Sequence, residues 1–113
     1  MTNGQVVAVL NMITRIKESD RTLPVRLSYA LNKNLQTLLE IYKPYQQSLK
    51  DLNLDGLSDD AVNALTEDDK KALADLLNLE ADADLYKVTL SDLDGADLTV
   101  NEMEVIQTFM MDD

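Results

Sequence analysis

Residues 23–52 carry an apolar repeat that constrains the fold more than any other stretch of this chain. In the segment LPVRLSYALNKNLQTLLEIYKPYQQSLKDL, large apolar side chains recur at spacings that alternate between four and three residues. These side chains are Leu31, Leu35, Leu38, Tyr42, Tyr45, Leu49 and Leu52. A spacing that averages about 3.5 residues places them on one stripe of an α-helix, along which another helix packs.

Two prolines set the expected start and shape of this helix. Pro24 suits the first turn, where the missing N–H costs no hydrogen bond. Pro44 removes the bond to the carbonyl of Glu40, so we expect a bend at residues 40–44. Because the repeat continues beyond Pro44, we predict one bent helix over residues 24–52. The stripe of residues 31–52 can also pair between chains, so a homodimer through it is a further expectation.

A capping pattern predicts a helix at the N-terminus. Thr2 and Gln5 have the spacing of a capping box, and an amphipathic apolar stripe follows them. We therefore predict a helix from residue 2 to about Lys17, followed by a polar loop over residues 18–22. The β-branched pair Val6-Val7 leaves a short strand open as the alternative for the first part.

Three further caps predict helices in the second half of the chain. Ser58 precedes a short helical stretch, and Thr66 precedes an apolar stripe that predicts a helix over 67–79. Thr99 and Glu102 form a second capping box before a closing amphipathic helix rich in methionine.

Residues 86–90, Tyr-Lys-Val-Thr-Leu, alternate between apolar and polar side chains and predict a short strand. A strand needs a partner for its backbone groups, and the candidates are residues 96–100, the valine-rich N-terminus or another chain. The expected fold is therefore mainly α with a small β element, in a single domain over residues 1–113. Its centre is the long bent helix 24–52, packed against the N- and C-terminal helices.

The net charge of −11 is distributed unevenly. Residues 1–50 hold seven basic and three acidic side chains, whereas residues 51–113 hold three basic and eighteen acidic ones. The chain thus divides into a basic helical half and an acidic half. The acidic half can aid solubility, shield the basic half within the fold, or bind a basic protein partner. Nucleic acid is not expected as a partner, because the acidic half repels phosphate and no nucleic-acid motif accompanies the basic side chains.

The candidate interaction residues are carboxylates that crowd the acidic half. They are Asp59, Asp60, Glu67, Asp68, Asp69, Asp82, Asp84, Asp92, Asp94 and Asp97.

The turn at residues 51–60 partly matches a calcium-binding loop, with oxygen ligands on alternate residues and Gly56 at the sharp turn. Val62 stands where a bidentate glutamate should close the shell, and Ser58 stands at a position that is normally apolar. A plain turn with a helix cap is therefore the favoured interpretation. The candidate calcium ligands are Asp51, Asn53, Asp55 and Asp59.

The chain contains no histidine and no cysteine, and its three glycines are isolated. It therefore carries no thiolate metal site, no histidine base and no glycine-rich phosphate loop. Paired carboxylates are expected from the composition alone. We predict a non-enzymatic protein without a cofactor.

The sequence also indicates a compartment. No apolar run approaches the roughly 18–20 residues that cross a bilayer, and no basic segment precedes the apolar part of the N-terminus. We therefore expect a cytoplasmic protein that is not bound to a membrane.

Two segments resemble a known family. LPVRLSYALNKNLQTLLEIYKPYQQSL resembles a pattern of Leu-Pro-Val, a basic residue, a tyrosine, Lys-Asn and a long helix. VTLSDLDGADLTVNEMEVIQTFM resembles a closing pattern of strand, acidic turn and helix. Together, over residues 5–52 and 85–112, they are similar to small proteins encoded by phages and prophages of Gram-positive bacteria, which are mostly uncharacterised.

The resemblance implies a phage setting and an assembly, regulatory or host-directed role, in the host cytoplasm or in the virion, and implies no catalytic residues. We therefore expect a protein-interaction module. One alternative is an acidic inhibitor that mimics nucleic acid toward a host nucleic-acid-binding or defence protein. The other is a calcium-binding module.

Overall fold

The computed structural model describes residues 1–111, and Asp112 and Asp113 of the predicted acidic half lie outside this range. The elements are α1 (Asn3–Glu18), α2 (Val25–Asp51), α3 (Asp59–Asn63), α4 (Glu67–Asn78), the 3-10 helix η1 (Leu90–Leu93) and α5 (Val100–Phe109). The prediction of a mainly α fold is confirmed.

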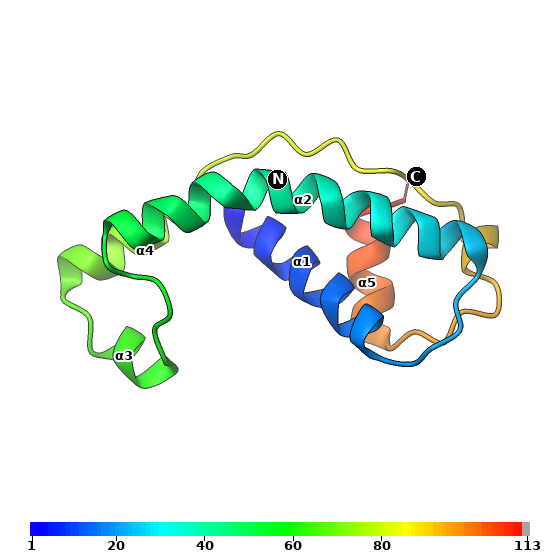
Figure 1. Cartoon of the computed structure of the whole chain (residues 1–113), viewed down its shortest axis with the longest axis horizontal. Coiled ribbons are helices and arrows are strands. Elements are labelled where there is room, and N and C mark those ends of the chain that lie inside the picture. Colours follow the sequence, from blue (N-terminus) through cyan, green and yellow to red (C-terminus); the bar gives the residue numbers. More distant parts are fainter. Residues whose placement is uncertain (112–113) are drawn as a thin grey trace.

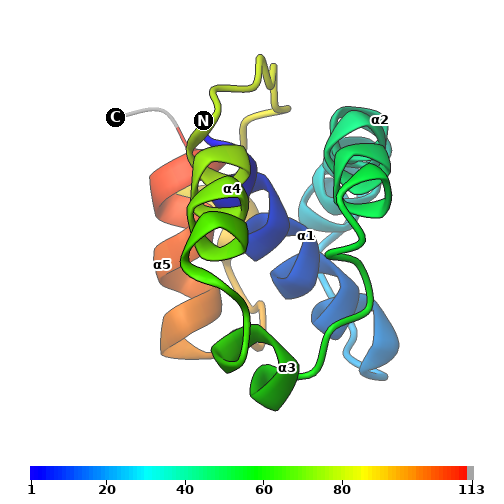
Figure 2. The same cartoon turned by 90° about the vertical axis from the view of Figure 1, so that its left-hand side faces the viewer.

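The helices form an elongated molecule of 47 × 27 × 21 Å. The long helix α2 spans most of its length, with α1 and α5 beneath one half and with α3 and α4 beyond the other end (Figure 1). Seen along the long axis, α1 lies between α2 and α5 (Figure 2). Residues 79–90 return from α4 along the top of the molecule to η1 (Figure 1).

The core lies where α1, α2 and α5 meet. Val9, Ile13, Leu27, Leu38 and Ile106 are fully buried there. Full burial of each such side chain contributes about 1.5–3 kcal/mol relative to exposure. The core therefore belongs to the N-terminal 50 residues and the C-terminal 30, and α1 is the element that joins them.

Part of the apolar stripe of α2 packs against other elements of the same chain. Leu31 and Leu38 are buried in the core, whereas Leu35 and Leu49 are only half-buried and Leu52 is exposed. Part of the stripe is therefore covered within the chain, and the homodimer through residues 31–52 stays a prediction.

The predicted shape of α2 agrees with the structure. The helix continues through Pro44 and ends at Asp51, and Figure 1 shows it as a curved helix. It ends because Asn53 adopts a left-handed backbone with φ 57°, a conformation that asparagine tolerates. The N–H of Leu54 then donates to the carbonyl of Leu49 at 2.8 Å.

The four predicted caps are all present. Thr2 and Gln5 form a capping box at α1, as do Thr99 and Glu102 at α5. The hydroxyls of Ser58 and Thr66 each accept a backbone N–H three residues later, at 3.2 Å, and so begin α3 and α4.

The predicted strand at 86–90 is reduced to a single bridge. The N–H of Val88 donates to the carbonyl of Met110 at 2.8 Å, in an isolated parallel bridge between Val88 and Met111. Thr89 caps η1 instead of continuing a strand, so the chain turns at Leu90. The end of the closing helix is thus the partner, which none of the three predicted candidates included.

Two residues before Val88, the side chain of Asn34 on α2 forms the hydrogen bonds to Tyr86 that the backbone of a partner strand would otherwise form. Its side-chain amide donates to the carbonyl of Tyr86 at 3.0 Å and accepts from the N–H of Tyr86 at 2.6 Å. Asn34 is fully buried, and this pair of bonds satisfies it. The extended segment is therefore attached to α2 by a side chain and to the end of α5 by backbone.

None of the helices in residues 1–111 combines the length and the apolar character needed to cross a bilayer.

Candidate functional site

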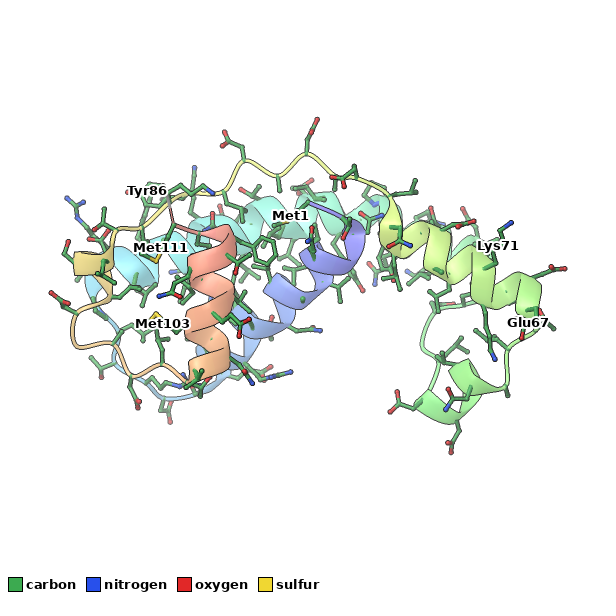
Figure 3. All side chains as sticks on the ribbon, turned by 180° about the vertical axis from the view of Figure 1, so that it is seen from behind. Met1, Glu67, Lys71, Tyr86, Met103 and Met111 are labelled. Atoms are coloured by element: carbon green, nitrogen blue, oxygen red, sulfur yellow. The ribbon has the colours of Figure 1, made fainter. Side chains whose placement is uncertain are left out.

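The segment between α2 and the returning extended chain forms what we call the acidic hairpin, residues 52–79, which contains α3 and α4. It holds seven carboxylates and two lysines. Figure 3 shows Glu67 and Lys71 on this hairpin, at the end of the molecule opposite Tyr86. The hairpin is therefore a separate, strongly acidic end of an elongated protein.

The hairpin lies outside the main core. Neither α3 nor α4 contains a buried residue, and Leu54 is the only residue of 52–79 that is buried. None of its side chains belongs to the core cluster or packs against it. Its half-buried apolar side chains, such as Leu73 and Leu77, therefore leave the hairpin with far less buried apolar surface than the body of the molecule.

The hairpin is attached where the C-terminus of α4 meets the N-terminus of α1. The backbone N–H of Asn3 donates to the carbonyl of Leu79 at 2.9 Å, and its side-chain amide donates to the carbonyl of Leu76 at 2.9 Å. Free N–H groups at a helix start and free carbonyls at a helix end satisfy one another here, and the two helix dipoles are complementary. A Cβ on Gly4 would lie in van der Waals contact with the carbonyl oxygen of Leu77, at 3.4 Å, so the two helix ends pack directly against each other here.

An antiparallel bridge between Thr2 and Glu80 continues the attachment, and the N–H of Ala81 donates to the carbonyl of Met1 at 2.7 Å. A groove of about 330 Å³ remains between α2 and α4, lined in part by Pro44, Tyr45 and Leu76. Burial raises the pKa of Tyr45, with a contribution from the neighbouring Tyr42.

The ten predicted interaction carboxylates fall into three places. The hairpin gathers five, of which Asp59 and Asp60 lie in the first turn of α3 and Glu67, Asp68 and Asp69 in the first turn of α4. Two lie exposed on the extended segment, and three lie on and after η1, at the far end of the molecule (Figure 1). The second group is Asp82 and Asp84, and the third is Asp92, Asp94 and Asp97.

The five hairpin carboxylates also stabilise their own helices. Acidic side chains in a first turn interact favourably with the helix dipole, each by about 0.3–1 kcal/mol at exposed positions. This local role explains why two short helices form with so little burial. It does not explain why the hairpin holds seven carboxylates against only two lysines.

Asp92 has a structural role. Its carboxylate accepts from the backbone N–H of Thr89 at 2.9 Å, and this bond lowers the pKa of Asp92 below its ordinary range. Asp92 therefore belongs to the cap of η1, which separates it from the freely exposed Asp94 and Asp97.

The candidate calcium ligands are not brought together. In the part of the chain that the structure describes, no three acidic side chains form a group that could hold a metal ion. Asp51 is the last residue of α2 and accepts from the side chain of Gln47 at 2.9 Å. Asp59 is already the first residue of α3. The turn therefore serves to end one helix and begin the next.

Few ion pairs join the basic half to the acidic half. Within residues 1–111, the ion pairs are Arg21–Glu102, Lys43–Glu40 and the N-terminal amine with Glu80. Only the first joins a basic side chain of residues 1–50 to a carboxylate of the acidic half. The hairpin carboxylates form no ion pair in this range, so self-neutralisation does not account for them.

Sequence reasoning missed the Arg21–Glu102 pair. Arg21 binds both oxygens of Glu102, with Nη2 donating at 2.9 Å, and Nη1 also donates to the carbonyl of Asp97 at 3.1 Å. Glu102 is also the capping-box residue of α5 and accepts from the N–H of Thr99. The Arg21 guanidinium lowers the pKa of Glu102, and Glu102 raises the pKa of Arg21.

The pair lies at one side of a groove of about 570 Å³ between α1 and α5, whose other lining residues include Met12, Arg15 and Val105. Because Arg21 ties the loop after α1 to the start of α5, and the other side-chain bond of Glu102 caps that helix, we assign the pair a structural role.

Comparisons with models of known protein families, with curated proteins and with solved structures find no match for this chain.

Proposed function

We propose that this chain is a non-enzymatic protein-interaction module that presents its acidic hairpin to a basic surface of another protein. The observation that carries the proposal is the position of the hairpin. It contributes no side chain to the core, yet it carries a dense set of exposed carboxylates without ion pairs. The fold holds this charge away from the body of the molecule.

The physical effect of such an arrangement is electrostatic. Like charges gathered on one end repel one another, which opposes folding of the hairpin, and they attract a complementary surface over a distance of about 10 Å at 0.1 M salt. Complementary fields mainly accelerate association and select the partner. The hairpin is therefore suited to rapid, salt-sensitive recognition of a cationic protein.

The resemblance to small phage and prophage proteins supplies the setting for the proposal. A partner in that setting is a component of virion assembly, a regulator, or a host protein encountered in the cytoplasm. An inhibitor that mimics nucleic acid is the second candidate, and the gathering of five predicted carboxylates on the hairpin favours it. The other five predicted carboxylates lie elsewhere, so mimicry is restricted to the hairpin.

The test compares two variants that remove the same number of charges. One is D59N/D60N/E67Q/D68N, which neutralises the hairpin, and the control is D82N/D84N/D94N/D97N, which neutralises four exposed carboxylates of the body. Circular dichroism first establishes that both retain their helices, because the hairpin substitutions also weaken helix starts.

Each immobilised variant then captures proteins from an extract of a Gram-positive host, and mass spectrometry quantifies them. We expect a basic protein that the wild type and the control retain, that the hairpin variant loses, and that about 0.5 M salt releases. Identical captured proteins for all three would contradict the proposal. If the captured protein binds DNA, competition by a short duplex separates mimicry from a simple protein contact.

A further inference from the structure

The groove of about 330 Å³ between α2 and α4 lies where the acidic hairpin joins the body, and we call it the junction groove. Figure 2 shows the two helices apart from each other, with α1 between them. One wall is a single face of α2, because its residues recur at helical spacing. They are Ile41, Pro44, Tyr45 and Ser48. The residues that follow on the other wall are Leu76, Leu79 and Ala81.

The junction groove is lined mainly by apolar side chains that the chain itself leaves uncovered. Leu79 lines it and is 55% exposed, and Pro44 is exposed as well. No side chain of residues 52–79 packs against the core cluster, so the end of α4 does not close over this face of α2. A partner that places apolar side chains in the groove therefore removes apolar surface from water on both sides.

Tyr45 places an unused polar group in the junction groove. The residue is only 8% exposed, yet no hydrogen bond within residues 1–111 involves its hydroxyl. Because no fully buried side-chain oxygen or nitrogen in this range lacks a partner, the hydroxyl is open to the groove that Tyr45 lines. The ring is held by Tyr42, with the two centroids 5.6 Å apart. A buried tyrosine hydroxyl ordinarily finds a partner, so this one is free to bond a ligand.

The charges along the junction groove have one predominant sign. Glu80 is the one charged residue that lines it, and the N-terminal amine lies 3.4 Å away. Asp75 and Asp68 are exposed on the same face of α4 as Leu79, at spacings of four and seven residues. Lys43, next to Pro44, is already paired with the neighbouring carboxylate of α2 at 2.9 Å. An occupant that extends from the groove along α4 therefore meets carboxylates, and it must be basic to be attracted.

We propose that the partner of the acidic hairpin binds through a basic amphipathic helix that places its apolar side chains in the junction groove. One polar group of this helix bonds the hydroxyl of Tyr45, and its lysines or arginines meet Asp75 and Asp68. The inference rests on the proposed function, which supplies a basic partner, and adds the form of the binding segment and the place where it docks. Helix-in-groove recognition uses apolar anchors at helical spacing. Because α4 rises about 16 Å from Asp68 to Leu79, about 12 helical residues reach both features.

Two synthetic peptides of about 14 residues serve as probes, with lysines on one face of a helix. The opposite face is leucine in the first peptide and alanine in the second. Fluorescence anisotropy measures binding, at concentrations below those at which the leucine peptide self-associates. We expect the wild type to bind the leucine peptide at least about tenfold more tightly, because alanine is too small to fill the groove. Equal binding of the two peptides overturns the proposal.

The matched variants are L79Q and L39Q. Leu79 and Leu39 are 55% and 45% exposed, so neither substitution disturbs the core, and neither changes the net charge. Leu79 lines the junction groove, whereas Leu39 lines a different groove between α1 and α2. We expect L79Q to bind the leucine peptide at least about fivefold more weakly, and L39Q to bind it as the wild type does. Tyr45→Phe keeps the ring and should weaken binding by about two- to fivefold.

Methyl NMR of the wild type locates the contact without any substitution. The resonances of Ile41 and Leu76, which line the junction groove, should shift when the leucine peptide is added. The resonances of Leu39 should not shift. Shifts that leave Ile41 and Leu76 unchanged overturn the proposal.

The variant D59N/D60N/E67Q/D68N separates this inference from the proposed function. If L79Q binds as the wild type does and the hairpin variant binds more weakly, the groove is not the docking site and the proposed function stands. If L79Q binds more weakly and the hairpin variant binds as the wild type does, the occupant need not be basic, and both are contradicted. A wild type that binds neither peptide up to about 1 mM overturns the inference as well.

Discussion

Helices form in two different ways in this chain. One operates in the body, which consists of α1, α2 and α5, and the other operates in the acidic hairpin. The body's helices are stabilised by tertiary packing, with fully buried side chains contributed by each helix. The helices of the hairpin depend on caps and on first-turn carboxylates, and they bury no residue completely. The difference indicates that the body sets the global stability of the protein, and that the hairpin can open locally without unfolding it.

The largest expected effect compares a leucine from each region. Leu38→Ala leaves a cavity in the core and should lower the free energy of unfolding by about 2–5 kcal/mol. Leu73→Ala removes a half-buried side chain of α4 and should cost about 1 kcal/mol or less. Urea denaturation measures both. Equal losses for the two variants would show that the hairpin folds as part of the core.

A smaller effect is expected at the contact between α2 and the extended segment. Asn34→Ala removes two hydrogen bonds to the backbone of Tyr86 and should lower the free energy of unfolding by about 1–3 kcal/mol. The control is Asn32→Ala, because Asn32 is exposed and accepts only from Lys17. Hydrogen exchange at the amide of Tyr86 should accelerate in the Asn34 variant alone. Unchanged exchange there would mean that the segment is held by its other contacts.

The third expected effect is that the stability of the body depends on pH. The Arg21 guanidinium lowers the pKa of Glu102 in the folded state, so the pair stabilises the fold above the ordinary glutamate pKa of about 4.5. This stability is lost as the pH falls below that value and through the lowered pKa. Glu102→Gln should therefore lower the melting temperature by several degrees at pH 7, with a smaller difference near pH 3.

The matched control for this prediction is Glu104→Gln. Glu104 is exposed on the same helix, so its substitution should change the melting temperature little at either pH. Thermal melts of both variants across pH 3–7 separate the contribution of the ion pair from the general effect of removing a negative charge. If Glu102→Gln melts at the same temperature as the control at pH 7, the ion pair does not stabilise the fold.

Local features of the fold were predictable from the residues. The starts of four helices follow from Thr2, Ser58, Thr66 and Thr99, because a cap depends on residues only three positions apart. The course of α2 through Pro44 was also predictable, since a proline acts on its own turn. The candidate site was predictable in part, because charge density marked the acidic half but not the hairpin within it.

The features that sequence reasoning missed involve residues distant along the chain. Asn34 is 52 residues from Tyr86, and Arg21 is 81 residues from Glu102. No local pattern marks either pair, although a lone asparagine within an apolar stripe is a signal that could have drawn attention to Asn34. The strand at 86–90 failed for a related reason, since the alternation was correct and its backbone partner lay at the end of α5.

The sequence by itself determined where helices begin and end, because hydrogen bonds and sterics within one turn decide this. Only the tertiary structure decided which face of each helix is covered. The heptad pattern marked Leu35 and Leu52 as strongly as Leu31, yet Leu31 alone of the three is buried, and Asn34 is buried beside it. Burial depends on where α1 and the extended segment lie against α2, and that arrangement results from contacts between distant parts of the chain.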